Sequence, residues 1–346
     1  MEYRPCGSSG LSLPVLGIGC WSFGGGAYWG DQRQRDATEI VARAIELGCS
    51  YFDTAEVYND GRSESALGVA LAGRRHEAIV GTKLSPHHAR PRDLRRRCEA
   101  SLGRLRTDYL DLYMLHWPLH PRSIPHYTDD PALAASPPDT DAAFEELLRL
   151  RDEGKIRYLG VSNFGRRQLE EVAAYDVAVD EICYNLLTRA VEYEILPHCR
   201  TNRIGVIGYM PLLQGILTGK YASVRDIPPQ RTRTRHFRGD RPGSRHGEPG
   251  HEELLQETLD RIRAVADDLG VPMMRLALAW TMSGPAVSCV INGVRDVGQL
   301  LENVSAATTR LDQATMEALD AATGTLKHAL GPSPDLYEPS CLPRVF

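Results

Sequence analysis

The chain has 346 residues, of which 42% are hydrophobic and 25% charged, and its formal net charge at pH 7 is −5. This composition is typical of a globular protein with a sizeable core and argues against a disordered chain. The mildly acidic charge gives no reason to expect binding to nucleic acid or to an anionic membrane surface.

The sequence also carries no signal for a membrane, a secretory pathway or a metal. No stretch approaches the roughly 18 uncharged apolar residues that a membrane-spanning helix needs. The first residues, MEYRPCGSSGLSLP, lack the basic start and apolar run of a secretory signal. The eight cysteines are scattered without a CxxC pair, which predicts reduced thiols and no metal site. We therefore expect a cytoplasmic protein.

Short apolar runs alternate with segments of helical periodicity along most of the chain. The expected strands are Val15–Cys20, Ser50–Thr54, Ala78–Lys83, Tyr109–His116, Ile156–Ser162, Glu181–Tyr184, Gly205–Met210 and Ala286–Asn292. The expected helices are Asp36–Leu47, Ser63–Leu71, Pro91–Leu105, Thr140–Glu153, Arg167–Tyr175, Tyr193–Thr201 and Asp296–Ala306, with Thr140 or Asp141 as the cap of the fourth. Eight strands that each return through a helix close most simply into a parallel (β/α)₈ barrel, the TIM barrel.

An open doubly wound sheet is the alternative, but no strand is followed by the GxGxxG turn that such sheets use for dinucleotides. Before the barrel, Glu2–Pro5 and Leu11–Leu13 flank CGSSG and predict a small β-hairpin. We expect residues 1–346 to form one domain, with a C-terminal tail at about 327–346.

Two segments are longer than the connections that a barrel usually has. Leu119–Pro138 is rich in proline and aspartate, and Ala222–Gly250 is rich in arginine. Both follow a strand, so we expect both at the C-terminal face of the barrel, where active sites of this fold lie. The arginine-rich loop is either a solvated, partly disordered excursion or a clamp for a cofactor.

Four ionisable residues lie at or just beyond three successive strand ends. Asp53 closes FDT, Tyr58 follows in the next loop, Lys83 ends IVGTK and His116 ends YMLH. The carboxyl ends of parallel barrel strands converge on one pocket, so these side chains are expected to be neighbours. Each of them alone has a structural explanation, such as a helix cap or a solvated rim residue, but the set indicates catalysis.

The electrostatics of this set are those of a proton-transfer site. A buried lysine is costly unless a carboxylate pairs with it, and Asp53 can be that partner. The ammonium of Lys83 is then expected to lower the pKa of Tyr58 from about 10 towards working pH. Such a tyrosine can give a proton to a carbonyl oxygen or accept it back, while His116 orients the substrate oxygen or assists the proton.

The four residues and the strings around them resemble the catalytic tetrad of the aldo-keto reductases. Further matching strings run from about Tyr3 to Leu326, and they are LGIGCW with FGGG, GKIRYLGVSNFG, YNLLTRAVE, IGYMPLLQGILTGKY and INGV…QLLENV. The resemblance implies a (β/α)₈ barrel that binds NADP or NAD in extended form without a GxGxxG motif.

The same resemblance implies cofactor contacts along the C-terminal face. Ser162 and Asn163 match the pair that binds the nicotinamide carboxamide, and Tyr209 matches the aromatic that stacks on the nicotinamide ring. The residues that match the pyrophosphate segment are Pro211, Leu212, Gly215 and Lys220, and those that match the adenosine end are Gly293, Arg295, Gln299 and Asn303. At the adenosine end, the free amides of a helix N-terminus favour an anion.

The chain departs from the family pattern at two places. Family members usually have glutamine where this chain has Glu181; a carboxylate facing the ring would favour the cationic, oxidised nicotinamide, whereas a protonated or turned-away side chain would not. Some branches read the 2′-phosphate with a lysine and an arginine at the positions of Gly293 and Gln299. Arg295 or an arginine of residues 222–250 can substitute, and we therefore favour NADP while NAD is possible.

The aromatic residues Trp21 and Trp117 are expected to line the substrate pocket, which suits aromatic carbonyls or sugars. The predicted function is an NAD(P)-dependent oxidoreductase that acts on an aldehyde, ketone, sugar or polyol. The first alternative is a regulatory, cofactor-binding subunit of a larger complex. A barrel isomerase or aldolase with Lys83 as a Schiff-base amine is a third class, which the pairing with Asp53 disfavours. Neither the exact substrate nor the oligomeric state follows from the sequence.

Overall fold

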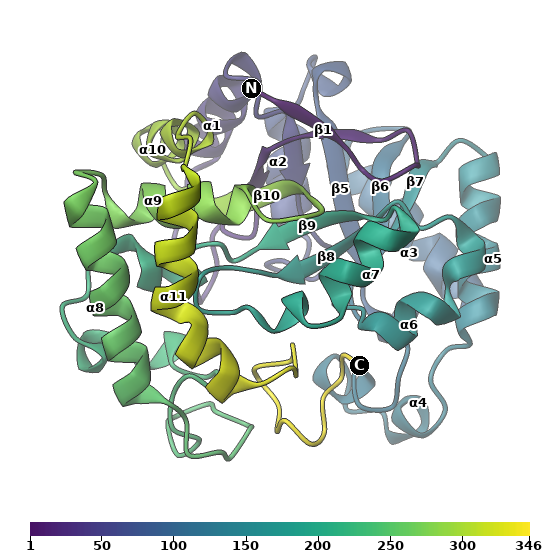
Figure 1. The fold of residues 1–346 in the computed structure, drawn as a ribbon. Helices are drawn as coiled ribbons and strands as arrows, with labels where there is room; N and C mark the ends of the chain where they lie inside the picture. The colour runs from purple at the N-terminus through teal and green to yellow at the C-terminus, as the bar shows by residue number, and fades with distance from the viewer.

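The chain folds into a closed barrel of eight strands, in a computed structural model that describes Met1 to Phe346 (Figure 1). The strands follow one another in the order β10-β3-β4-β5-β6-β7-β8-β9, and every neighbouring pair is parallel. The barrel strands are β3 (Leu16–Gly19), β4 (Tyr51–Asp53), β5 (Ile79–Leu84), β6 (Leu110–Leu115), β7 (Ile156–Ser162), β8 (Val179–Cys183), β9 (Gly205–Tyr209) and β10 (Val287–Gly293). The predicted (β/α)₈ barrel is confirmed.

Helices surround the barrel, and an antiparallel hairpin of β1 (Tyr3–Pro5) and β2 (Ser12–Pro14) precedes it, as predicted. The helices are α1 (Gln34–Glu46), α2 (Arg62–Ala70), α3 (Pro91–Leu105), α4 (Pro131–Ala135), α5 (Thr140–Asp152), α6 (Arg166–Glu171), α7 (Ile195–Asn202), α8 (Glu252–Asp268), α9 (Met273–Met282), α10 (Val297–Ala307) and α11 (Gln313–Leu330). No helix is both long and apolar enough to cross a bilayer.

The structure corrects several predicted boundaries. The cap of α5 is Asp139, whose carboxylate accepts a hydrogen bond from the Ala142 amide at 2.8 Å, so the predicted caps Thr140 and Asp141 lie inside the helix. The helix expected over 167–175 ends at Glu171 and continues as a separate 3₁₀ turn. Helices α4, α8, α9 and α11 were not predicted, and α11 takes up the first residues of the expected tail.

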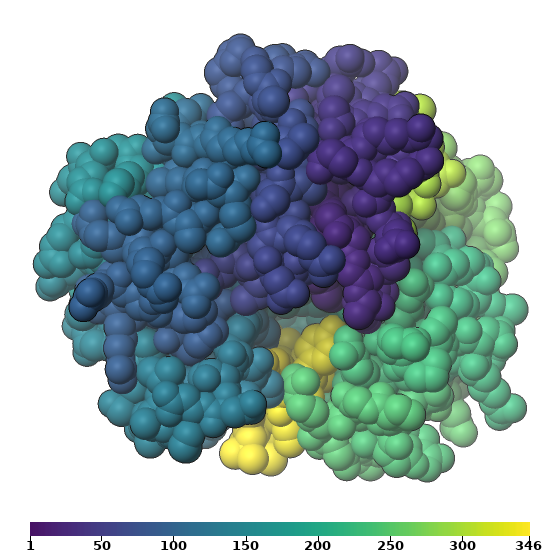
Figure 2. All heavy atoms as spheres, turned by 180° about the vertical axis from the view of Figure 1, so that it is seen from behind, coloured from purple at the N-terminus to yellow at the C-terminus, as the bar shows by residue number.

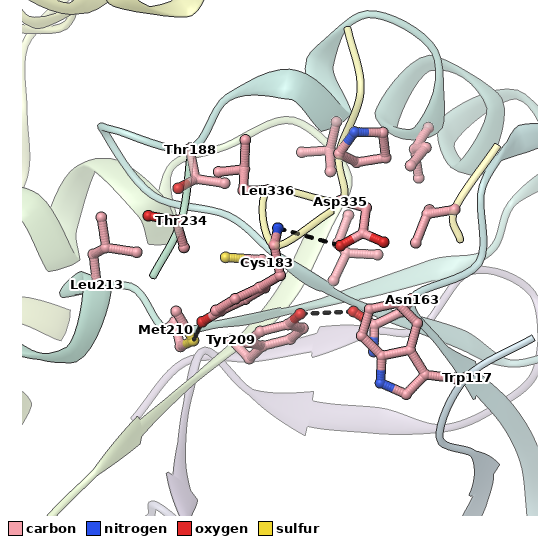
Figure 3. Close-up of a pocket in the computed structure, with 16 residues that line it drawn as sticks. Trp117, Asn163, Cys183, Thr188, Tyr209, Met210, Leu213, Thr234, Asp335 and Leu336 are labelled. Atoms are coloured by element: carbon pink, nitrogen blue, oxygen red, sulfur yellow. Dashed lines mark hydrogen bonds between the residues drawn. The ribbon is translucent and has the colours of Figure 1, made fainter. Parts of the chain in front are cut away.

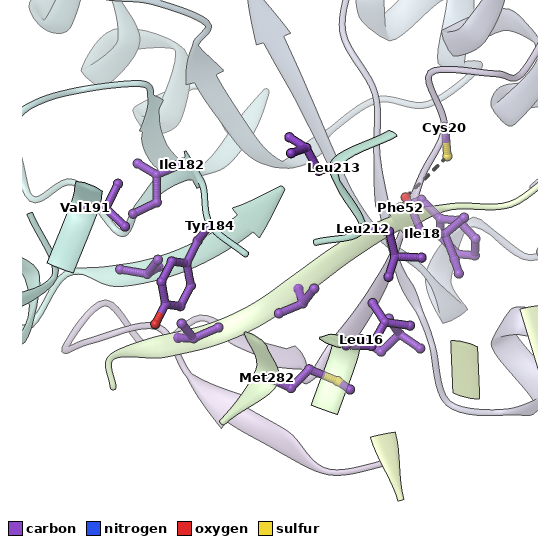
Figure 4. Packing of buried hydrophobic residues seen from close by; sticks show 14 of the residues in the cluster. Leu16, Ile18, Cys20, Phe52, Ile182, Tyr184, Val191, Leu212, Leu213 and Met282 are labelled. Atoms are coloured by element: carbon purple, nitrogen blue, oxygen red, sulfur yellow. Dashed lines mark hydrogen bonds between the residues drawn. The ribbon is translucent and has the colours of Figure 1, made fainter. Parts of the chain in front are cut away.

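The hairpin closes the N-terminal end of the barrel. Leu11 and Leu13, the latter fully buried, pack in one apolar cluster with Tyr51 of β4 and Met114 of β6. The Tyr51 ring needs glycine beside it, because a Cβ at Gly17 would lie 2.6 Å from the ring. A larger cluster fills the space between the barrel and the helices, and Figure 4 shows a part of it.

The opposite, C-terminal end of the barrel carries the long segments. In Figure 1, helix α4, the loop over residues 222–250 and the end of the chain all lie on the side away from β1. Figure 2 shows the C-terminal segment at the surface between the part of the chain that contains the insertion after β6 and the part that contains residues 222–250. These three segments therefore form the rim of the face on which the predicted catalytic residues lie.

Replacing Tyr51 by alanine is expected to lower the free energy of unfolding by about 3–5 kcal/mol, because it removes a fully buried ring and leaves a cavity. The control is Leu301→Ala on α10, whose side chain is 44% exposed and whose loss is expected to cost under about 1 kcal/mol. Urea unfolding of both variants measures the two costs. Equal costs would contradict the role given to Tyr51.

Candidate active site

Lys83 lies at the centre of the predicted catalytic set, and its side chain is fully buried. Its ammonium donates to Asp53 Oδ1 at 2.5 Å and to the Thr54 carbonyl at 3.1 Å. A second carboxyl group, that of Glu181 on β8, has Oε1 at 3.2 Å from the same nitrogen. Burial alone would lower the pKa of Lys83, but the Asp53 carboxylate, by its charge and its hydrogen bond, contributes most to raising that pKa, so the ammonium stays charged.

Tyr58 lies above this ion pair, in the loop that follows β4. The Lys83 ammonium is 5.2 Å from the centre of its ring, and the His116 and Trp21 rings are at 5.6 Å and 5.8 Å. The structure thus brings the four predicted residues and Trp21 together, as parallel strand ends require.

The expected lowering of the Tyr58 pKa does not occur in this state of the site. Burial raises the pKa of Tyr58 above its ordinary value; Lys83 opposes this shift, while Asp53 and Glu181 add to it. The prediction overlooked burial and the second carboxyl group. Tyr58 is therefore a neutral phenol that holds its proton, with a cation nearby to stabilise the phenolate once the proton has left.

His116 is a neutral imidazole in the same site. Burial, and then the charge of Lys83, lower the pKa of His116 well below its ordinary value. Its Nδ1 is buried and has no hydrogen-bond partner in the protein. The ring can therefore orient a bound oxygen by a hydrogen bond, but it carries no charge at neutral pH.

Glu181 makes the site unusual, because two carboxyl groups face one ammonium. Burial and the neighbouring Asp53 raise the pKa of Glu181 well above its ordinary value, although Lys83 opposes the shift. Its second oxygen is buried and has no partner. Of the two possibilities that the sequence left open, a protonated Glu181 is the one that this environment favours.

The predicted nicotinamide residues lie beside the tetrad and are connected to it. Asn163 donates from Nδ2 to the His116 carbonyl at 3.1 Å and accepts from the Tyr209 hydroxyl at 2.6 Å. Ser162 donates to the Glu181 carbonyl at 3.0 Å. Asn163 also adopts a φ of 61°, a strained value that positions its side chain at the end of β7. These residues form a polar edge between His116 and Tyr209.

Beyond Tyr209 and Met210, the residues Pro211 and Leu212 lead into a tight turn that brings two cations to Gly215. A Cβ on Gly215, where φ is 90°, would lie 3.2 Å from Lys220 Nζ and 3.3 Å from the terminal nitrogen of Arg231. Neither cation forms an ion pair, and Arg231 donates only to the Tyr221 hydroxyl at 2.8 Å. A bare glycine backbone between two uncompensated cations fits the pyrophosphate of a dinucleotide.

Arg231 and Arg233 are the residues that the sequence did not single out within the arginine-rich loop. Other arginines of this loop are compensated: Arg238 by Asp240, Arg241 by Glu252, Arg245 by Glu338 and Arg235 by Glu248 and two carbonyls. Arg233 has a guanidinium 6.0 Å from the Tyr28 ring and a buried Nε without a partner. The loop is packed on the barrel, so the alternative of a solvated excursion does not describe it.

The residues predicted to bind the adenosine part of the cofactor agree with that prediction only in part. Gly293 ends β10 and Asn303 accepts from Asn292 at 3.0 Å, but Arg295 donates to the carbonyls of Trp29 and Asp31. The expected free amides of α10 are also partly taken, because Asp296 caps the helix by accepting from the Gln299 amide at 2.8 Å. Gln299 in turn accepts from the Arg295 amide at 3.0 Å.

Both predicted pocket aromatics lie at the mouth of the barrel. Trp21 stacks on Tyr28 with 5.2 Å between ring centres, and Trp117 lies under the guanidinium of Arg344 at 3.8 Å. Figure 3 shows that Trp117, Asn163 and Tyr209 share a cavity with residues of the C-terminal segment, among them Asp335 and Leu336 (Figure 3). That segment is fastened by the buried ion pair of Arg344 with Asp335 at 2.7 Å.

The comparisons with known proteins agree with this geometry. The profile described as "Aldo/keto reductase family" matches residues 15–323. The aldo-keto reductase YhdN of Bacillus subtilis is 30% identical over 314 residues, which are 87% of each chain. A solved structure of an aldo-keto reductase of Klebsiella pneumoniae in complex with NADPH is 27% identical, with 93% of this chain and 96% of that chain covered and a TM-score of 0.68. The structure of the glycerol dehydrogenase of Gluconobacter oxydans is also 27% identical, with 96% of this chain and 97% of that chain covered and a TM-score of 0.77.

Compared with the wild type, the Glu181→Gln variant is expected to be relatively more stable at pH 8 than at pH 5. A carboxyl group whose pKa is raised by folding binds its proton more tightly in the folded state, so the wild type loses stability as the pH rises above the unfolded value near 4.5. Glutamine does not titrate, so the variant does not lose stability in this way. The difference in unfolding free energy between variant and wild type should grow by at least about 1 kcal/mol between the two pH values, which is less than the effect of one pKa unit.

Urea unfolding at pH 5 and pH 8 measures this difference, and Glu317→Gln on the exposed face of α11 is the control. A difference that is the same at both pH values would show that Glu181 is ionised throughout and would contradict this description of the site.

Proposed function

The chain belongs to the aldo-keto reductase family of NAD(P)-dependent oxidoreductases, and from this premise we propose that it interconverts a small carbonyl compound and its alcohol, with Tyr58 as general acid or base. The proposed substrates are aldehydes, ketones, sugars or polyols. The observation that supports this most is the buried Lys83, held by Asp53 at 2.5 Å and located 5.2 Å from the centre of the Tyr58 ring. A bound nicotinamide dinucleotide would supply or accept the hydride.

In the reductive direction, Tyr58 begins as a neutral phenol. As the carbonyl oxygen gains negative charge, the O–H bond of Tyr58 breaks and its proton moves to that oxygen, which completes the alcohol. Lys83 stabilises the phenolate that remains, and water at the open side of the site returns the proton. The neutral His116 orients the reacting oxygen by a hydrogen bond. In the oxidative direction the same residues act in the reverse order.

The remaining site residues are proposed to hold the dinucleotide. Ser162, Asn163 and Glu181 face its carboxamide, and Tyr209 supports the ring. Pro211, Leu212, Gly215 and Lys220 follow the pyrophosphate, joined by Arg231; Gly293, Arg295, Gln299 and Asn303 surround the adenosine. The eight free cysteines are compatible with the proposed cytoplasmic location.

We further propose that NADP is preferred over NAD. Lys220 and Arg231 at Gly215 suit the pyrophosphate that both cofactors share, and the uncompensated Arg233 adds a further positive charge, which suits a ligand with three phosphates better than one with two. Arg295 is exposed at the adenosine end and is bound only to carbonyl groups, so it can take the 2′-phosphate. The similar Klebsiella pneumoniae enzyme was crystallised with NADPH.

Tyr58→Phe is expected to lower kcat/KM by about 10²- to 10⁴-fold, the usual contribution of a general acid, with little change in cofactor affinity. Steady-state turnover with an aldehyde panel and fluorescence titration of NADPH measure the two quantities. Tyr113→Phe is a matched control, because the Tyr113 hydroxyl is also buried but lacks any partner. Full turnover in Tyr58→Phe would contradict the proposal, and a protein without turnover on any carbonyl or alcohol would favour the regulatory subunit.

Arg295→Ala is expected to lower kcat/KM with NADPH by about 10- to 100-fold, the value of a charge-assisted contact of about 1.5–3 kcal/mol, with a smaller loss for NADH. Initial rates with each cofactor at one saturating substrate concentration give the two losses. Arg310→Ala, with a side chain that is 84% exposed, is the surface control. Equal losses with both cofactors would mean that Arg295 only holds the loop of Trp29 and Asp31.

A further inference from the structure

Two residues that have no role so far, His87 and Tyr127, continue the wall of the catalytic site. Their rings are stacked with 6.0 Å between centres and 22° between planes. The Tyr127 ring lies 6.2 Å from that of His116, which in turn lies 5.6 Å from that of Tyr58. All four rings are half-buried, whereas Lys83 beneath them is fully buried. The rings therefore form one continuous row of contacts that runs from Tyr58 through His116 and Tyr127 to His87.

The two residues come from different strand ends. His87 lies in the short 3₁₀ turn Pro86–His88, three residues beyond the end of β5, the strand that carries Lys83. Tyr127 lies in the long insertion that follows β6 and His116. The insertion after β6, to which the proposed mechanism gives no role, therefore supplies the residue that lies beside His116.

His87 presents a polar atom that the protein does not satisfy. Its Nδ1 is buried and has no hydrogen-bond partner. Burial, together with the neighbouring His88, lowers the pKa of His87 to about 4, so at neutral pH the ring has one N–H and one lone pair. A buried polar atom left unpaired is unfavourable, and a ligand that supplies the missing partner recovers the lost free energy.

The His87 ring also packs against His88, whose own ring is fixed by polar contacts. The His88 ring is 3.6 Å from it, centre to centre. His88 Nδ1 lies 3.0 Å from Glu56 Oε1, which also accepts from the Ser85 amide at 3.0 Å, and Arg97 lies 2.7 Å from His88 Nε2. A ring that contacts both His88 and Tyr127 is restricted to a narrow range of orientations, as a binding group should be.

We propose that His87, with Tyr127 beside it, binds a hydroxyl group of the substrate close to the reacting carbon, so that the preferred substrates are short hydroxylated aldehydes and the corresponding polyols. This inference rests on the proposed function. A neutral imidazole can accept a hydrogen bond from an alcohol and can donate one to it, so it suits a hydroxyl group better than an ion. A carbonyl compound without that hydroxyl leaves the imidazole unpaired, which is how sites built to bind hydroxyls discriminate.

The aromatic surroundings fit the same class of substrate. The Trp21 and Tyr127 rings offer apolar faces to the C–H groups of a hydroxylated chain, while His87 and His116 offer polar atoms at their edges. A pocket for a purely aliphatic or aromatic aldehyde needs polar atoms only at the reacting oxygen.

The experiment compares glyceraldehyde with propanal, which has the same three-carbon chain without hydroxyls, in the full-length enzyme. In His87→Phe, the ratio of kcat/KM for glyceraldehyde over that for propanal is expected to fall about 10- to 100-fold, mainly through the KM for glyceraldehyde. His87→Asn keeps a donor and an acceptor and is expected to recover most of the ratio. His120→Phe is the matched control, because its ring packs edge-on against Phe346 and not against His87 or Tyr127.

An unchanged ratio in His87→Phe, in an enzyme whose turnover still depends on Tyr58, would overturn the hydroxyl site and leave the proposed function standing. If His87→Asn fails to recover the ratio of kcat/KM for glyceraldehyde over that for propanal, the hydroxyl site is likewise overturned and the proposed function still stands. Turnover that is independent of Tyr58, or absent with both aldehydes, would overturn the proposed function and this inference with it.

Discussion

The account depends on one buried ammonium ion. Lys83 is fully excluded from solvent and stays charged because the Asp53 carboxylate pairs with it, while the Glu181 carboxyl group on a second strand of the barrel lies 3.2 Å from the same nitrogen. That charge acts on its neighbours: it contributes to keeping His116 neutral, and in the proposed mechanism it stabilises the phenolate that Tyr58 becomes after proton transfer. The barrel supplies the geometry, because strands that run in one direction bring side chains from distant parts of the chain to one end.

The other predicted site residues of the C-terminal face lie around this ion in connected groups. Asn163 connects the carbonyl of His116 to the hydroxyl of Tyr209, so the site of proton transfer and the expected nicotinamide site share one hydrogen-bonded edge. Two uncompensated cations, Lys220 and Arg231, lie beside the bare backbone of Gly215, where the pyrophosphate is proposed to bind. Next to His116, the insertion after β6 contributes Tyr127, whose ring also stacks with that of His87.

The fold and the tetrad could be predicted because they depend on local signals. Buried strands and amphipathic helices alternate visibly, and Asp53, Lys83 and His116 end their strands, so the barrel itself makes them neighbours. Other features depend on tertiary structure that no local pattern encodes. Glu181 reaches Lys83 only because the closed barrel brings β8 towards β5. Arg231 could be separated from its paired neighbours only once the positions of Glu248, Glu252 and Glu338 were known, although a run of arginines with few nearby acids was a usable signal. The pKa of Tyr58 required its burial, which a sequence does not give.

The most direct test of the central claim is a crystal structure of the protein with NADP⁺ and an unreactive substrate analogue bound. The account predicts the Tyr58 hydroxyl within about 2.6–3.2 Å of the analogue's oxygen, on the side of Lys83. It also predicts the reacting carbon at about 3–3.5 Å from nicotinamide C4. A Tyr58 hydroxyl that points out of the cavity, with the dinucleotide bound away from Lys83, would contradict it.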